Sequence, residues 1–452
     1  MTVPIPGSEP QTRAARQPRR IVVCLDGTAN NDAAKYRRDQ GQDVLKPTNV
    51  LKLCRAVRPW DEETGREQIS YYSIGVGSLT RYPGVANRVL ATIDKFAGGA
   101  WGAGFESNVE RALTFITLNH EPGDEVFLFG FSRGAATARG LTRFLDWAGG
   151  LPVKADAYFL PLLFEQFVLS RGQANVANFV ARLNAQSAAE KKSGLGPLKP
   201  IHVEFLGVWD TVMALGSRFR ATGGSTTEVS KSFYVDAQPA RCVGNAYQAL
   251  AVDEMRFDFR PEIWTGPRPD QPGQSVEQRW FPGVHSNIGG GYVHDGLANL
   301  AFRWIFQAAE ARGLALHRQF LKFYPGYPYD RLYRSESLFY RVLDRLRRRY
   351  GKGRRQLTGR PATANLALDP TVIYRLRADP KAVKPGGGPA DLLYPRVPQP
   401  YRPRNVIELL ASQPDLDAYL RELVPDEEHR RLPDDVLRQI DALRQDRAGQ
   451  GA

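Results

Sequence analysis

Residues 128–134 read LFGFSRG, in which an apolar run stops at a single serine, Ser132. Gly130 stands two positions before this serine and Gly134 two positions after it, and small alanines follow. A sharp turn from a strand into a helix strains the backbone of the central residue, and its neighbours must lack side chains that would clash. The spacing therefore predicts a nucleophilic serine at a strand-to-helix turn.

A serine hydroxyl becomes a good nucleophile only when a base accepts its proton and a third group holds that base. His285 lies in WFPGVHSNIGGGY, where an apolar run meets a glycine-rich loop, and we expect it to be the base. His294 is the alternative base. Asp210 directly follows the apolar run FLGVW, and Asp253 follows the next one, LAV. We favour Asp210 as the acid, because nucleophile, acid and base then follow one another along the chain, and Asp253 is the alternative.

A serine that attacks an ester carbonyl also needs backbone N–H groups that stabilise the developing oxyanion. The N–H of Arg133 comes directly after the serine, at the start of the expected helix, where the helix dipole is positive. The tripeptide Asp26-Gly27-Thr28 follows the first apolar run, RIVVCL. We expect Gly27 or Thr28 to offer the second N–H and Asp26 to brace their loop.

Short apolar runs alternate with helical segments along the first two thirds of the chain. The expected strands are 20–28, 68–77, 125–131, 201–209, 246–252 and 277–284, and the clearest helices are 107–119 and 135–147. This alternation predicts an α/β fold with a mostly parallel central sheet and helices on both faces. Parallel strands end at a common edge, which would bring the serine, the histidine and the aspartate together.

The rest of the chain is divided by composition. We expect a flexible tail at 1–19, a catalytic domain at 20–400 and a helical C-terminal segment at 401–452. Two stretches of the catalytic domain, 150–200 and 312–400, interrupt the strand–helix rhythm, and we expect them to be lid-like insertions.

The net charge of +13 is concentrated in a few places, and RVLDRLRRRYGKGRRQ (341–356) carries eight basic residues and one Asp. This run is either a solvated helix end with its loop or a patch that attracts anionic lipid headgroups. Nucleic-acid binding is not expected, because Tyr350 is the one aromatic residue among these charges.

No apolar stretch is long enough to span a bilayer, and the first twenty residues lack the apolar middle of a signal peptide. Cys24, Cys54 and Cys242 show no metal-type spacing, which indicates reduced thiols and a cytoplasmic site of synthesis. Signal-independent secretion and peripheral membrane contact are both compatible with these features. We expect neither a cofactor nor a structural metal.

Four stretches taken in order, CLDGTANN, GFSRGAATARG, GVWDTV and FPGVHSNIGGGY, resemble a bacterial family of α/β hydrolases that includes type VI secretion phospholipase effectors. The resemblance runs from about residue 20 to about residue 380. It implies an α/β-hydrolase fold with Ser132 as nucleophile, His285 as base and an Asp as third member, and lipid esters as substrates. Separately, we expect a delivery or inhibitory partner protein. Asn287 stands where the family usually has an acidic residue, and Cys24 and Leu25 replace aromatic residues.

The sequence thus predicts a serine lipase, phospholipase or esterase that works through an acyl-enzyme. One alternative is a metal-assisted phosphohydrolase with Asp26, Asp210 and His285 as ligands. Another is a non-catalytic binding module that keeps the hydrolase scaffold.

Overall fold

Eight strands form one sheet in the computed structural model, in the order β10-β9-β8-β7-β6-β1-β5-β4 among the residues described. Those residues are 16–27, 37–39, 42–44, 47–75, 100–213, 234–333, 354–357, 366–378 and 400–450. The strands are β1 (Arg20–Leu25), β4 (Trp60–Asp61), β5 (Arg66–Ser73), β6 (Glu125–Phe131), β7 (Val203–Trp209), β8 (Val243–Ala251), β9 (Ser275–Phe281) and β10 (Leu366–Leu368), and β2 (Arg37–Asp39) and β3 (Gln42–Val44) form a separate pair. Every neighbouring pair in the main sheet is parallel except β4 and β5. The predicted α/β fold is confirmed.

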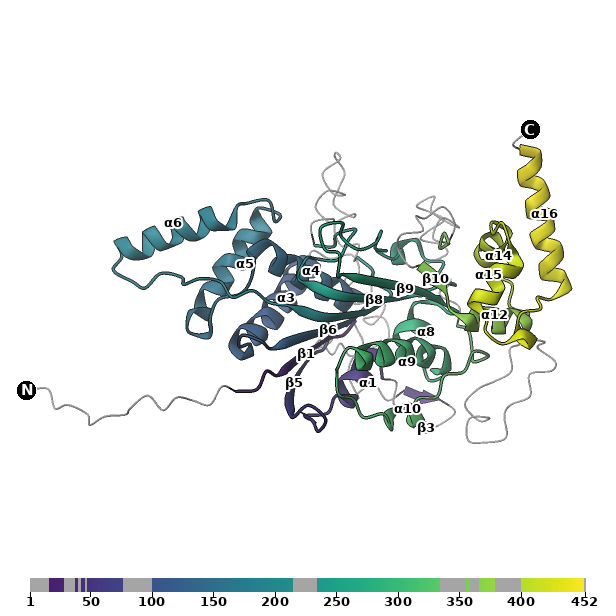
Figure 1. Ribbon diagram of the computed structural model, residues 1–452, viewed down its shortest axis with the longest axis horizontal. Helices are drawn as coiled ribbons and strands as arrows, with labels where there is room; N and C mark the ends of the chain where they lie inside the picture. The colour runs from purple at the N-terminus through teal and green to yellow at the C-terminus, as the bar shows by residue number, and fades with distance from the viewer. Residues whose placement is uncertain are drawn as a thin grey trace, which may run out of the picture.

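Helices cover both faces of this sheet (Figure 1). They are α1 (Asn49–Ala56), α3 (Ala100–Asn119), α4 (Arg133–Ala148), α5 (Leu160–Leu169), α6 (Val176–Ala189), α8 (His285–Gly289), α9 (Gly296–Ala311), α10 (Phe320–Phe323), α12 (Pro370–Arg377), α14 (Arg404–Ala411), α15 (Leu416–Leu423) and α16 (Asp434–Gln450), with short 3-10 turns η1 (Lys154–Phe159), η2 (Phe257–Phe259) and η4 (Glu427–His429). One apolar core lies between the sheet and α3, α4 and α5, and a second lies between the sheet and α1 and α9.

The strands serve both cores because successive side chains of a strand point to opposite faces. Along β6, Val126 and Leu128 belong to the core under α3 and α4, and Phe127, Phe129 and Phe131 belong to the core under α9. Burial on both faces explains why the central strands read as nearly unbroken apolar runs.

The sharpest turn of the fold joins β6 to α4. Ser132 lies at φ 57° and ψ −120°, outside the regions that non-glycine residues favour, and its N–H donates to the carbonyl of Trp209 at 3.0 Å. A Cβ on Gly130 would lie 2.5 Å from the carbonyl oxygen of Gly134, and one on Gly134 would overlap the carbonyl oxygen of Leu25. The two glycines therefore allow β6, α4 and β1 to approach closely enough to form the turn.

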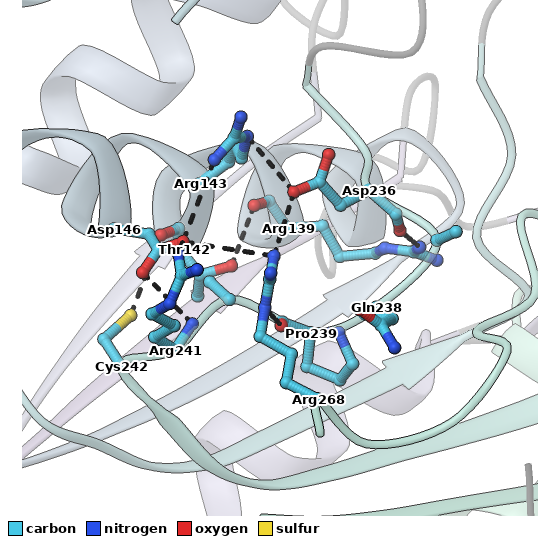
Figure 2. Close-up of polar contacts among 12 residues, drawn as sticks. Arg139, Thr142, Arg143, Asp146, Asp236, Gln238, Pro239, Arg241, Cys242 and Arg268 are labelled. Atoms are coloured by element: carbon cyan, nitrogen blue, oxygen red, sulfur yellow. Dashed lines mark hydrogen bonds and ion pairs between the residues drawn. The ribbon is translucent and has the colours of Figure 1, made fainter. Parts of the chain in front are cut away.

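The far half of α4 is fixed by an arginine–aspartate cluster, which Figure 2 shows. The fully buried Arg139 donates to the carbonyl oxygens of Asp236 and Glu262 at 2.7 and 2.6 Å. Arg143 of α4 and Arg268 of a neighbouring loop both lie 3.2 Å from the carboxylate of Asp236. Burial lowers the pKa of Arg139 to about 9, so the guanidinium stays charged at neutral pH. This cluster ties α4 to the loops that follow β7 and η2, and so holds the helix that carries Ser132.

The insertion at 150–200 lies away from the serine. It begins where α4 ends and returns at the start of β7, and the backbones of Leu151 and Lys199 pair with each other. Both ends are therefore at the amino edge of the sheet, opposite the turn at Ser132. The lid role that we expected for 150–200 stays a prediction.

The C-terminal helices pack against the β10 end of the sheet. Val406, Ile407 and Leu410 of α14 share an apolar cluster with Leu250 of β8 and Trp280 of β9. The helical character expected for 401–452 agrees with these elements, and the proposed domain boundaries stay a prediction. None of the described helices combines the length and the apolar character needed to cross a membrane.

The close contact at Gly134 can be tested with Gly134→Ala. We expect its free energy of unfolding to fall by about 1–3 kcal/mol, because the new methyl group must displace the backbone of β1. Gly273→Ala is the matched control, since a Cβ there meets nothing within 4 Å, and it should change stability by less than about 0.5 kcal/mol. Equal urea midpoints for the two variants would contradict the packing described for the turn.

Candidate active site

Three side chains from three loops form a continuous hydrogen-bonded chain at the carboxyl edge of the sheet. Nε2 of His285 lies 2.9 Å from Oγ of Ser132, and Nδ1 of His285 lies 2.6 Å from Oδ2 of Asp210. Ser132 follows β6, Asp210 follows β7, and His285 opens α8 shortly after β9. The structure thus brings the predicted nucleophile, acid and base together, and their catalytic roles stay a prediction.

His285 is buried between aromatic rings. The rings of Phe131 and Phe259 lie 4.7 and 5.0 Å from the imidazole. Burial lowers the pKa of His285 from its ordinary value of 6.5, and the contact with Asp210 opposes that shift. The carboxylate accepts a hydrogen bond from the N–H at Nδ1, which leaves Nε2 as the acceptor that faces the serine hydroxyl.

Asp210 has more than one partner. It occupies the left-handed region at φ 43°, and its N–H donates to the carbonyl of Ala249 at 2.8 Å. Oδ1 accepts the N–H of Ala251 at 3.1 Å. Oδ2 accepts from His285 and also from Nη2 of Arg355 at 3.0 Å. The carboxylate is fully buried, so these donors replace the water that burial removed.

The structure describes two of the three expected oxyanion donors, Arg133 and Gly27. Arg133 begins α4, so its N–H lies at the positive end of the helix dipole. The N–H of Gly27 donates to Oδ1 of Asp26 at 2.6 Å, and its role as an oxyanion donor stays a prediction. Oδ2 of Asp26 accepts from the hydroxyl groups of Thr48 and Tyr72 at 2.6 and 2.7 Å. Asp26 thus braces its loop, and Thr28 lies outside the described residues.

The two alternative residues have other contacts. Oδ2 of Asp253 accepts from the N–H of Gly283 and the hydroxyl of Tyr401 at 2.7 and 2.9 Å, and burial raises the pKa of this carboxyl to about 6. The ring of His294 lies 6.4 Å from that of Tyr333. Asp253 was the alternative acid and His294 the alternative base. In the hydrogen-bonded chain these positions are taken by Asp210 and His285.

Two charged groups near the imidazole, Glu254 and Arg355, were not predicted from the sequence. The buried Glu254 accepts the N–H of His285 at 3.2 Å and pairs with the guanidinium of Arg256 at 2.9 Å. Despite its burial, the Arg256 contact lowers the pKa of Glu254 to about 2, so the carboxylate stays ionised. The signal available for Glu254 was its position, because it directly follows Asp253 at the end of a strand. Arg355 had no comparable signal in the sequence.

Arg355 also changes the interpretation of the basic run 341–356. Most of that run lies outside the described residues. Arg354 is exposed, whereas Arg355 is buried against Asp210. At least one of its eight basic residues is therefore not part of a lipid-facing surface.

The ligand set of the metal-dependent alternative does not form. Across the described parts of the chain, no three His, Cys, Asp or Glu side chains gather in a way that could hold a metal ion. Asp26 is instead bonded within its own loop and to Thr48 and Tyr72.

A family model described as the catalytic domain of Tle1-like phospholipase effectors of the type VI secretion system matches residues 19–308, more than half of the chain. The chain belongs to this family. The family suggested by the four sequence motifs is thereby confirmed, and membership supports a lipid-hydrolysing enzyme.

Individual relatives are distant. The uncharacterized protein YEL023C of Saccharomyces cerevisiae is 25% identical over 250 residues, which cover 54% of this chain and 32% of the yeast protein. The chain therefore spans about a third of the length of the curated relative that it matches. An uncharacterized protein from Pseudomonas aeruginosa has a TM-score of 0.38 at 16% identity, covering 94% of this chain and 62% of that one. The Tle1 effector bound to the VgrG spike of the type 6 secretion system has a TM-score of 0.31 at 20% identity, covering 61% and 51%.

The choice between the two aspartates is tested with Asp210→Asn and Asp253→Asn. We expect Asp210→Asn to lower the rate of Ser132 labelling by a fluorophosphonate on the order of 10³-fold, because the amide no longer holds the imidazole in the right tautomer. Asp253→Asn keeps an acceptor for Gly283 and Tyr401 and should label at close to the native rate. The reverse order of rates would show that Asp253 is the acid.

Proposed function

We propose that the protein is a serine ester hydrolase that acts on lipids, specifically phospholipids, through an acyl-enzyme on Ser132. The observation that supports this most directly is the unbroken hydrogen-bonded chain from Ser132 through His285 to Asp210. Family membership supports the substrate class.

In the first half of the reaction, Oγ of Ser132 attacks the ester carbonyl as its proton moves to Nε2 of His285. The new oxyanion lies near the N-terminus of α4, where the N–H of Arg133 is the proposed donor. The tetrahedral intermediate then collapses, the C–O bond to the alcohol breaks, and His285 gives the proton to the departing oxygen.

In the second half, a water molecule gives a proton to Nε2 and attacks the acyl-enzyme. Collapse of that intermediate returns the proton to Ser132 and releases the carboxylic acid. Asp210 stays ionised throughout and stabilises the imidazolium that forms in each half. Cofactor chemistry has no step in this cycle.

Contact with an anionic membrane through 341–356, signal-independent secretion, and a delivery or inhibitory partner stay predictions. The VgrG spike is a partner of the Tle1 effector in the solved complex. For this chain, delivery on such a spike is part of the proposal.

Ser132→Ala tests the nucleophile. We expect hydrolysis of p-nitrophenyl esters, and release of fatty acid from mixed phospholipid vesicles, to fall by at least about 10³-fold, since no other group can form the acyl-enzyme. Mass spectrometry of the vesicle products identifies the bond that is cleaved. Undiminished hydrolysis with an intact thermal unfolding transition would refute the mechanism. Loss of native activity in EDTA, with no labelling by a fluorophosphonate, would instead favour a metal-dependent enzyme.

The pH dependence follows from the burial of His285. The neutral imidazole is the active base, and its pKa is lowered in the folded protein. We therefore expect kcat/KM to stay high down to the ordinary value of 6.5 and to reach half its maximum below that pH. The unfolded chain binds this proton more readily than the native state, so the stability due to the neutral buried imidazole is present above pH 6.5 and declines as the pH falls below it. A midpoint of the acid limb above pH 6.5 would contradict this assignment.

A further inference from the structure

A buried arginine contacts the acid of the proposed triad. Nη2 of Arg355 donates to Oδ2 of Asp210 at 3.0 Å, the same oxygen that accepts Nδ1 of His285 at 2.6 Å. The two side chains of this ion pair are 1% and 0% exposed. A charged pair this deep in the protein is strongly coupled to its surroundings, because little water screens it.

The burial of Arg355 is not explained by a full set of hydrogen bonds to its guanidinium. Nε and Nη1 of Arg355 are buried without a hydrogen-bond partner among the residues described. Burying such donors costs free energy, and a buried ion pair often stabilises a fold no more than apolar residues of similar size would. A role at the site accounts for the arginine better than a role in stability.

The segment that carries Arg355 is anchored by the C-terminal helices. Nδ2 of Asn405, in α14, donates to the carbonyl oxygens of Arg355 and Val252 at 3.2 and 3.0 Å. Leu357 belongs to the apolar cluster of the C-terminal helices. Tyr401 donates to Asp253, whose carboxylate holds the N–H of Gly283, two residues before His285. The family match ends at residue 308. Arg355 lies beyond it, and so do its anchors Leu357, Tyr401 and Asn405.

We propose that Arg355 is a positioning residue for the ester hydrolysis: its guanidinium fixes the Asp210 carboxylate and weakens the hold of that carboxylate on the imidazolium of His285. This inference rests on the proposed function. It makes the C-terminal helices part of the active-site support, although no residue of theirs touches the serine in the contacts described.

The electrostatic effect has a defined sign. The charged groups that act on His285 in the described structure are Asp210 after β7 and Glu254 and Arg256 after β8, and Arg355 contacts Asp210. Removing the positive charge of Arg355 leaves the attraction of both carboxylates for the imidazolium less opposed. The imidazole should then hold its proton to higher pH, and the carboxylate should lose one of its orienting contacts.

Arg355→Gln and Arg355→Lys test the proposal, with Arg354→Gln as the matched control because Arg354 is the exposed neighbour. We expect Arg355→Gln to lower kcat for a p-nitrophenyl ester by roughly 10–100-fold with little change in KM, because the base is misplaced. The acid limb of its pH profile should move up by roughly half a unit to one unit. Arg355→Lys should restore the position of the acid limb but lower kcat by about fivefold, because an ammonium lacks the fork of a guanidinium. Arg354→Gln should match the native protein in every respect.

Several outcomes would overturn the proposal. These are an Arg355→Gln profile that superimposes on that of Arg354→Gln, and a loss of activity that follows the unfolded fraction in thermal melts. If Arg355→Gln does not fold, Arg355→Lys decides, and a native kcat in that variant refutes the positioning role. A direct titration of the His285 imidazole by NMR, assigned with His285→Gln, separates this inference from the proposed function. Should Ser132→Ala retain hydrolysis, the function fails, while the imidazole pKa of Arg355→Gln still shows whether Arg355 acts on His285.

Discussion

The strained backbone of Ser132 is the constraint on which the site depends. A non-glycine residue at φ 57° and ψ −120° costs about 1–3 kcal/mol, so it persists only where the surrounding structure leaves no alternative. Here β6 is buried on both faces, the serine N–H is bonded to the end of β7, and Gly134 packs on the backbone of β1. The arginine–aspartate cluster fixes the other end of α4. The hydroxyl is therefore held by the same contacts that build the sheet.

The remaining groups of the site follow from parallel pairing. The strands β6, β7, β8 and β9 are neighbours in the sheet and end at one edge, so the residues after each strand meet there. Hydrogen bonds join these strand ends to one another: Asp210 binds the backbone of Ala249 and Ala251, and Glu254 binds that of His285. A shift of one strand would displace several groups at once. Such coupling keeps distances in the site within the narrow range that proton transfer requires.

The sequence was informative where a local pattern had a physical cause. The apolar runs located the strands because two-sided burial requires them, and the Gly-x-Ser-x-Gly spacing located the turn because close backbone contacts exclude side chains. Composition marked 150–200 as an insertion, but it does not say at which edge of a sheet an insertion leaves and returns, so the lid expected there stays a prediction. Arg355 was read as part of a basic surface, because a run of like charges looks the same whether one member turns inward or not. Contacts between side chains that are far apart in the chain produce no periodic pattern in the sequence, so they could not be predicted from it.

The burial of Asp210 explains why the site extends beyond the strands that define it. A carboxylate removed from water must be compensated by donors, and in the described part of the sheet these are the amide of Ala251 and the ring of His285. A carboxylate paired with the imidazole alone would favour the protonated imidazole more strongly, because an opposite charge stabilises the charged form. A second cation on the same oxygen satisfies the carboxylate without increasing the basicity of the imidazole. That cation lies outside the family match, and the hydrogen bond from Asn405 to the backbone of Arg355 links its segment to α14, so the proposed site depends on contacts beyond the matched region.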